Sequence, residues 1–150
     1  MEMPAPDPAI LARKEAVVRR LAAGLPTAAV IADPAETRAY ECDALTAYAC
    51  PPLAVVLPGS TDEVATALRI CHEEGVPIVP RGSGTSLAGG ALPTADSVIL
   101  GVARLTEVLD TDLANRTITV QTGRTNLSVT GAVEEERSEE RRVGKECPSP

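Results

Sequence analysis

The chain has 150 residues and a net charge of −7, and it contains no Phe, no Trp and only two Tyr. This length suits one domain or part of a larger one, with a core built from Ala, Val, Leu and Ile. The acidic balance argues against a nucleic-acid interface, which needs a basic patch. No apolar run reaches the roughly 18 residues of a membrane-spanning helix, so we expect no membrane span.

The N-terminal segment, residues 1–35, is expected to be helical. Asp7 is a favourable N-cap and Pro8 suits the first helical position, which predicts one helix from here to Gly24. Residues 28–32 then predict a short strand, and residues 33–52 a loop with a short helix. The helix that ends at Gly24 has most of an apolar stripe at helical spacing, given by Ile10, Lys14, Val17, Val18 and Leu21.

A strand, a helix and a second strand follow. Residues 53–57 are a continuous apolar run, which is typical of a buried strand. Ser60 and Glu63 form a capping box that starts a helix, Gly75 ends it, and residues 76–79 form the next strand. This order predicts a right-handed βαβ unit with parallel strands. The buried helix face is expected to comprise Val64, Ala67, Leu68 and Cys71.

The remaining elements complete an α+β fold. Residues 97–102 predict a third strand. Residues 107–110 and 117–121 flank a polar turn and predict an antiparallel hairpin with one solvated face. Residues 122–126 are a turn, and residues 127–133 predict a further helix. The expected fold is therefore a βαβ unit plus an antiparallel hairpin.

Cysteine usage predicts a reduced, cytoplasmic setting. The four cysteines are Cys42, Cys50, Cys71 and Cys147, and no pair has the C-x-x-C spacing of a zinc or redox motif. Residues 1–7 also lack the basic and apolar regions of a secretory signal. We therefore expect neither a disulfide nor a metal site.

The composition changes abruptly after Val133. Residues 134–150 are rich in charge, and a solvated helix end or a disordered tail is the simplest interpretation. However, residues 137–147 match the in-frame translation of a common sequencing-library adapter. We therefore expect residues 134–150 to be a non-native tail, with the reading frame leaving its gene near Val133. Reads that span this codon test the idea, and a genuine genomic tail would contradict it.

The most informative motif is the glycine-rich stretch at residues 80–91. It follows an apolar strand, and its glycines leave backbone N–H groups uncovered, so it suits an anion such as phosphate. Arg81 adds a planar cation suited to phosphate oxygens. The stretch is neither a Walker A loop nor a dinucleotide fingerprint, because Leu87 stands where the latter requires a third glycine. A purely structural glycine-rich turn is the alternative.

Several separated segments carry a family resemblance. Residues 40–48, 52–58, 75–93 and 120–127 occur in the order and at the intervals of one flavoprotein family. Roughly residues 36–133 resemble the N-terminal FAD-binding segment of the vanillyl-alcohol-oxidase (PCMH-type) flavoproteins. Within that group the chain is most similar to the FAD-linked subunit of glycolate oxidase and the related D-lactate dehydrogenases. The domain from residue 36 to 133 is thus expected to be a partial FAD-binding domain.

The resemblance implies a set of cofactor-binding residues. Backbone N–H groups of the loop would hold the FAD pyrophosphate, the loop would fold back at two glycines, and one further glycine would contact the cofactor. FAD is expected to bind non-covalently, because Thr85 lies near the place where some relatives carry a histidine and His72 lies in the preceding helix. The residues implied for the pyrophosphate are Arg81, Gly82, Ser83, Gly84, Thr85 and Ser86. The loop would fold back at Gly89 and Gly90, and the further glycine in contact with the cofactor would be Gly123.

The resemblance also implies the activity. It predicts an FAD-dependent oxidoreductase that oxidises a 2-hydroxy acid, of the glycolate or D-lactate type, to the 2-oxo acid. Catalytic residues are expected outside this chain, so these 150 residues alone are expected to be inactive. Other oxidase subunits are expected partners of the full-length enzyme, at the inner face of the membrane. The alternative is a non-enzymatic fragment whose glycine loop is only structural.

Overall fold

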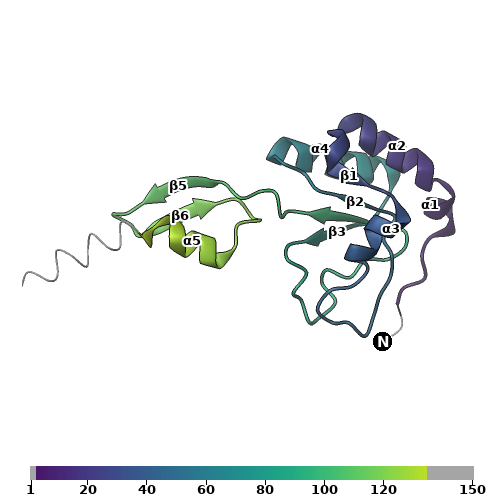
Figure 1. The fold of residues 1–150 in the computed structure, drawn as a ribbon. Helices are drawn as coiled ribbons and strands as arrows, with labels where there is room; N and C mark the ends of the chain where they lie inside the picture. Colours follow the sequence, from purple (N-terminus) through teal and green to yellow (C-terminus); the bar gives the residue numbers. More distant parts are fainter. Residues whose placement is uncertain (1–2, 135–150) are drawn as a thin grey trace, which may run out of the picture. The chain divides into compact units, whose positions relative to one another are not determined.

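The computed structural model describes residues 3–134, and the chain divides into two compact units, Met1–Leu105 and Thr106–Pro150. The first unit holds a four-stranded sheet with the strand order β1-β2-β4-β3. The second holds a two-stranded hairpin and one helix (Figure 1). None of the helices between residues 3 and 134 is long and apolar enough to cross a membrane.

The N-terminal region forms two helices instead of the single predicted helix. Asp7 caps the first as expected, accepting a hydrogen bond from the Ala9 N–H at 2.8 Å. The chain leaves helical geometry at Arg13, whose Nη1 donates to Glu74 Oε2 at 2.7 Å. This bond ties the break to the end of a later helix. The elements are α1 (Pro8–Ala12), α2 (Lys14–Gly24), η1 (Thr27–Ala29), β1 (Val30–Ile31), α3 (Pro34–Thr37) and η2 (Arg38–Tyr40).

Helix α4 (Thr61–Glu74) begins and ends where the sequence predicts. The Ser60 hydroxyl accepts from the Glu63 N–H at 3.2 Å. In a capping box the Glu63 carboxylate would accept a hydrogen bond from the N–H of Ser60. Here it accepts from the N–H of Gly59, one residue earlier in the chain. Gly75 ends the helix with φ +65°. The prediction for Leu68 is wrong, since it is 42% exposed while Ile70 is buried in its place.

A third strand separates the two parallel strands of the predicted βαβ unit. β2 (Ala54–Val56) and β3 (Ile78–Arg81) each pair in parallel with β4 (Val98–Gly101), which lies between them. All residues of β4 are buried, as a central strand requires. β3 contains Pro80, which lacks an N–H and is tolerated at a sheet edge. The strands of the predicted βαβ unit are therefore parallel without being neighbours.

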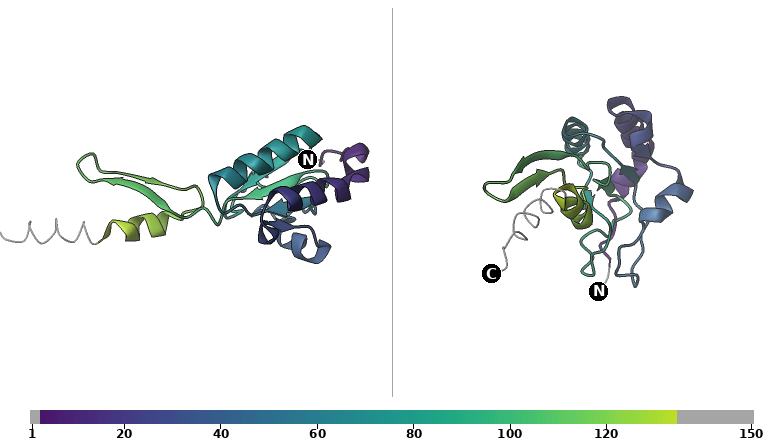
Figure 2. Two further views of the ribbon diagram at one scale, coloured as in Figure 1. Left: turned by 90° about the horizontal axis from the view of Figure 1, so that it is seen from above. Right: turned by 60° about the vertical axis from the view of Figure 1, so that its left-hand side comes forward.

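Helices α2 and α4 pack together on one side of this sheet (Figure 1 and the left view of Figure 2). Alternation along the strands sorts their side chains between the two faces. Val55 and Ile99 are fully buried but do not belong to the cluster beneath the helices. The residues that form this cluster from the sheet and the two helices are Val17, Leu21, Ala54, Val56, Ala67, Ile70, Cys71, Val98 and Leu100.

The second unit confirms the predicted hairpin and helix. β5 (Val108–Asp112) pairs antiparallel with β6 (Thr117–Val120), with an irregularity between Val108 and Asp110. α5 (Asn126–Ala132) follows and is capped by the Thr125 side chain. The predicted α+β class is thereby confirmed. The tail prediction falls on residues 134–150, and all of these except Glu134 lie outside the described residues.

Substituting Gly75 with Ala is expected to lower the free energy of unfolding by about 1–2 kcal/mol, the cost of left-handed backbone for a residue with a Cβ. An ideal Cβ at Gly75 meets no atom within 4 Å, so only the backbone term changes. Urea unfolding measures this difference. The control is Gly75→Asn, which tolerates the conformation and should lose less. Equal losses for Ala and Asn would contradict the assignment.

Cys71 is expected to resist thiol reagents until the protein unfolds. Burial, reinforced by the nearby Glu74 carboxylate, raises the pKa of the Cys71 thiol to about 11. At pH 8 the native protein therefore holds this residue as the unreactive thiol. Cys42 and Cys50 are partly exposed and serve as internal controls. Peptide mapping after iodoacetamide treatment, with and without urea, locates the label; rapid native labelling of Cys71 would refute the prediction.

Candidate functional site

The glycine loop leaves the sheet at the carboxyl end of β3. Arg81, the first of its predicted site residues, is still a strand residue and pairs with Gly101 of β4. Its carbonyl accepts the last bond of the ladder, from Val102 N at 3.0 Å. Ligands of parallel sheets bind beyond the carboxyl ends of the strands. The loop therefore occupies the edge of the sheet where a binding site is expected.

Two glycines and one hydroxyl shape the loop. Gly84 and Gly89 have φ values of +70° and +76°, in the left-handed region that favours glycine. The Ser86 hydroxyl accepts hydrogen bonds from Ala88 N at 3.2 Å and from Gly90 N at 3.4 Å. These bonds close the second half of the loop into a turn at Gly89 and Gly90. The loop's course is thus set by its own residues before any ligand is present.

The first half of the loop keeps its donors free of protein partners. Across the described chain, none of the backbone N–H groups from Gly82 to Leu87 meets a protein acceptor at hydrogen-bonding distance. Their residues are exposed or partly exposed. Successive free N–H groups form an anion-binding concavity. This arrangement fits a pyrophosphate, as the positions Gly82, Ser83, Gly84, Thr85 and Ser86 suggested from the sequence.

The Arg81 side chain lies within the protein. Its Nη1 donates to Cys42 O at 2.7 Å and lies 3.4 Å from Ala91 O. Its Cζ is 5.7 Å from the centre of the Tyr40 ring, within range of a cation–π contact. A Cβ built on Gly84 would lie 2.3 Å from Nη2. The sequence suggested a cation for phosphate oxygens, whereas in the structure Nη1 of this guanidinium binds the chain's own carbonyls and its Cζ lies over the Tyr40 ring.

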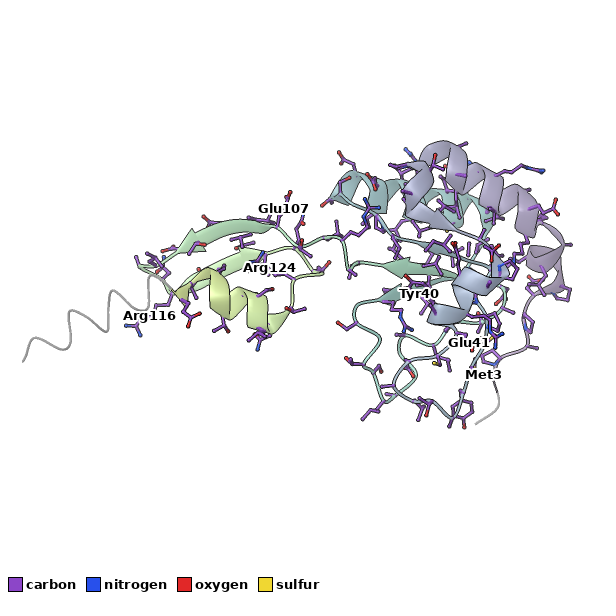
Figure 3. The ribbon with its side chains drawn as sticks, in the orientation of Figure 1. Met3, Tyr40, Glu41, Glu107, Arg116 and Arg124 are labelled. Carbon is purple, nitrogen blue, oxygen red and sulfur yellow. The ribbon has the colours of Figure 1, made fainter. Side chains whose placement is uncertain are left out.

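The segment around Tyr40 contributes to the site and was not predicted to do so (Figure 3). Asp43 lies in this segment and is buried, with 4% of the residue exposed. Asp43 Oδ1 accepts from Leu45 N at 2.9 Å, while Oδ2 is buried without a partner in the described chain. No local pattern could reveal the link to Arg81, because Cys42 and Arg81 lie 39 residues apart.

Gly123 belongs to the second unit and lies in the turn between β6 and α5. The neighbouring Arg124 stabilises this turn, donating to Thr106 O at 2.7 Å and to Ser128 O at 3.2 Å (Figure 3). The assignment of Gly123 to the cofactor stays a prediction. His72 is exposed on α4 and has no place in the glycine loop. Among residues 3–134, no group of three or more His, Cys, Asp or Glu could hold a metal ion.

Comparison with known families shows the family to which the chain belongs. The sequence model of the family described as "FAD binding domain" matches residues 52–138, more than half of the chain. The match includes β2, α4, β3, the glycine loop and the hairpin. The chain therefore belongs to this FAD-binding family, and FAD is its cofactor. The resemblance to the FAD-linked subunit of glycolate oxidase is confirmed.

Two curated relatives and one solved structure support this conclusion. Glycolate oxidase subunit GlcD of Escherichia coli (strain K12) is 48% identical over 94 residues, which are 63% of this chain and 19% of the relative. D-2-hydroxyglutarate dehydrogenase of Xanthomonas citri pv. viticola is 34% identical over 130 residues, 87% of this chain and 26% of the relative. The chain thus spans about a fifth to a quarter of these relatives.

The solved structure is p-cresol methylhydroxylase with substrate bound. It matches with a TM-score of 0.74 and 20% identity, covering 89% of this chain and 26% of that chain. At this identity the similarity establishes the fold alone. The expected PCMH-type fold is confirmed.

Replacing Gly84 with Ala is expected to lower the free energy of unfolding by about 1–3 kcal/mol, through strain at a positive φ and the clash with Arg81. Gly82→Ala is the matched control, because a Cβ there meets no atom within 4 Å and its φ is not positive. It should change stability by less than about 0.5 kcal/mol. Chemical unfolding of both variants measures the difference, and equal stabilities would contradict the described loop geometry.

Proposed function

We propose that this chain supplies the pyrophosphate-binding part of an oxidoreductase that oxidises a 2-hydroxy acid to the corresponding 2-oxo acid. The observation that carries the proposal is the run of N–H groups from Gly82 to Ser86 without protein partners, at the carboxyl end of β3 in an FAD-binding domain. The relatives named for glycolate oxidase and D-2-hydroxyglutarate dehydrogenase support the class of substrate. Glycolate and D-lactate are the proposed types.

The loop's role is to hold and orient the cofactor. Each hydrogen bond to a charged acceptor contributes roughly 1.5–3 kcal/mol, so four or five could anchor a dinucleotide despite its ordering cost. The Ser86 bonds and the left-handed glycines form the loop in advance, which lowers that cost. FAD held by the N–H groups of residues 82–86 would supply the redox chemistry of the reaction, the acceptance of a hydride equivalent.

The attachment of FAD is proposed to be non-covalent. The chain has one histidine, His72, and it lies exposed on α4. The loop offers Ser83, Thr85 and Ser86 hydroxyls, which are poor candidates for a flavin linkage in this setting. Binding therefore rests on hydrogen bonds and packing, and FAD should be released when the protein is denatured.

The catalytic groups are proposed to lie in parts of the protein that this chain does not include. The chain covers about a fifth of the glycolate oxidase subunit, and no residue described here is assigned to proton or hydride transfer. We propose that residues 1–150 alone do not turn over a hydroxy acid. Further proposals are other oxidase subunits as partners and a cytoplasmic site at the inner face of the membrane.

Titration of the ¹⁵N-labelled chain with ADP, FAD and riboflavin tests the role of the loop. ADP and FAD carry the pyrophosphate, so both should shift the amide signals of residues 82–86, whereas riboflavin should not. ADP-induced shifts confined to other residues would contradict the pyrophosphate role. If ADP and FAD shift no signals at millimolar concentration, the loop is only a structural turn.

Two substitutions at Ser83 separate the backbone from the side chain. Ser83→Ala keeps the N–H and should leave the affinity for ADP within about twofold. Ser83→Pro removes one donor and should weaken binding by about 10-fold or more, the equivalent of one charge-assisted bond. Calorimetric titration gives both values. A large loss in Ser83→Ala would show that the hydroxyl, and not the backbone, binds the anion.

A further inference from the structure

We propose that Arg81 is the positioning residue of the glycine loop, acting through the loop's backbone and without touching the phosphate. The inference rests on the proposed function of the loop and adds to it. Sequence reasoning treats an arginine beside a phosphate loop as a direct ligand, because its planar fork matches phosphate oxygens. The contacts of the Arg81 side chain in the structure point instead to a role in positioning the loop.

The guanidinium joins its own segment to two others, one at residues 40–42 and one at Ala91. Its Nη1 donates to the carbonyl of Cys42 and also faces the carbonyl of Ala91, at 2.7 and 3.4 Å. The Tyr40 ring lies beneath its Cζ. Residues 40–42 lie in the segment between β1 and β2, and Ala91 lies at the end of the loop. One side chain therefore fixes where the loop returns relative to residues 40–42.

Gly84 shows how closely the loop lies on this side chain. A Cβ at Gly84 would lie 2.3 Å from Nη2, 2.5 Å from Cζ and 2.9 Å from Nε of Arg81. All three atoms belong to the guanidinium plane, so the loop's left-handed turn is seated on that plane. Any larger residue at this position would displace Arg81. Gly84 and Arg81 thus form one structural unit.

This arrangement holds the loop in shape while its N–H groups stay free. Within residues 3–134, the backbone from Gly82 to Leu87 makes no backbone hydrogen bonds that would fix it, and the guanidinium beneath Gly84 takes the place of such bonds. Preorganisation of this kind raises affinity by removing the ordering cost from the binding step. Arg81 therefore contributes to cofactor affinity through loop order.

The conservative variant Arg81→Lys distinguishes the two roles. Lysine keeps the charge but loses the guanidinium plane that lies against Gly84 and over the Tyr40 ring. We expect ¹⁵N order parameters of residues 82–90 to fall in the ligand-free variant, and the affinity for ADP to fall about tenfold or more. If Arg81 were a direct phosphate ligand, Lys would weaken the binding of ADP but leave the ligand-free loop as ordered as before. That result would overturn the proposal.

Tyr40 provides a second variant pair that leaves Arg81 in place. Tyr40→Leu removes the ring under the guanidinium and should loosen residues 82–90, whereas Tyr40→Phe keeps the ring and should not. A double variant, Arg81→Lys with Gly84→Ala, should bind ADP no more weakly than Gly84→Ala alone, because both changes break the same unit. Additive losses, or a rigid loop in Tyr40→Leu, would count against the proposal.

The ligand-free measurements keep this inference separate from the proposed function. If the unaltered chain binds neither ADP nor FAD, the proposed function fails. The order parameters of Arg81→Lys and Tyr40→Leu still decide whether Arg81 positions the loop. If the unaltered chain binds ADP but both variants keep an ordered loop, the proposed function stands and the role given to Arg81 is wrong.

Discussion

The parallel pairing of β4 with both β2 and β3 is the constraint on which the first unit depends. β4 is buried along its whole length, so only the central place in the sheet satisfies its backbone and its side chains. Its pairing with β3 ends at Arg81 and Gly101. The glycine loop therefore starts at the carboxyl edge of the sheet, where its backbone is available to a ligand.

The site that results relies on backbone donors held by a few side chains. Ser86 closes the return of the loop, and Arg81 supports its first turn from below. Such a site needs few large side chains, which agrees with a chain that has almost no aromatic residues. Tyr40 is one of the two aromatic residues, and it lies under the guanidinium that supports the loop. The chain belongs to an FAD-binding family, whose model matches a range that includes this loop.

Much of the fold could be predicted because its signals are local. The Asp7 and Ser60 caps, the stop at Gly75 and the alternation in β6 each depend on neighbours a few residues apart. The errors arose where distant segments compete. Arg13 interrupts the N-terminal helix while it binds Glu74, 61 residues away. The burial of Leu68 was predicted wrongly because burial depends on which segments cover a side chain.

The sequence by itself determined the class of fold, the glycine loop and its family, since turn glycines, caps and apolar runs act over short distances. Only the tertiary structure decided the strand order and the task of Arg81. Both depend on segments that meet in space: β4 enters between two strands that precede it, and residue 81 meets residues 40, 42 and 91. From the sequence alone, an arginine beside a glycine-rich phosphate loop is interpreted as a ligand of the phosphate. The carbonyl groups that Arg81 contacts in the structure support its proposed role in positioning the loop.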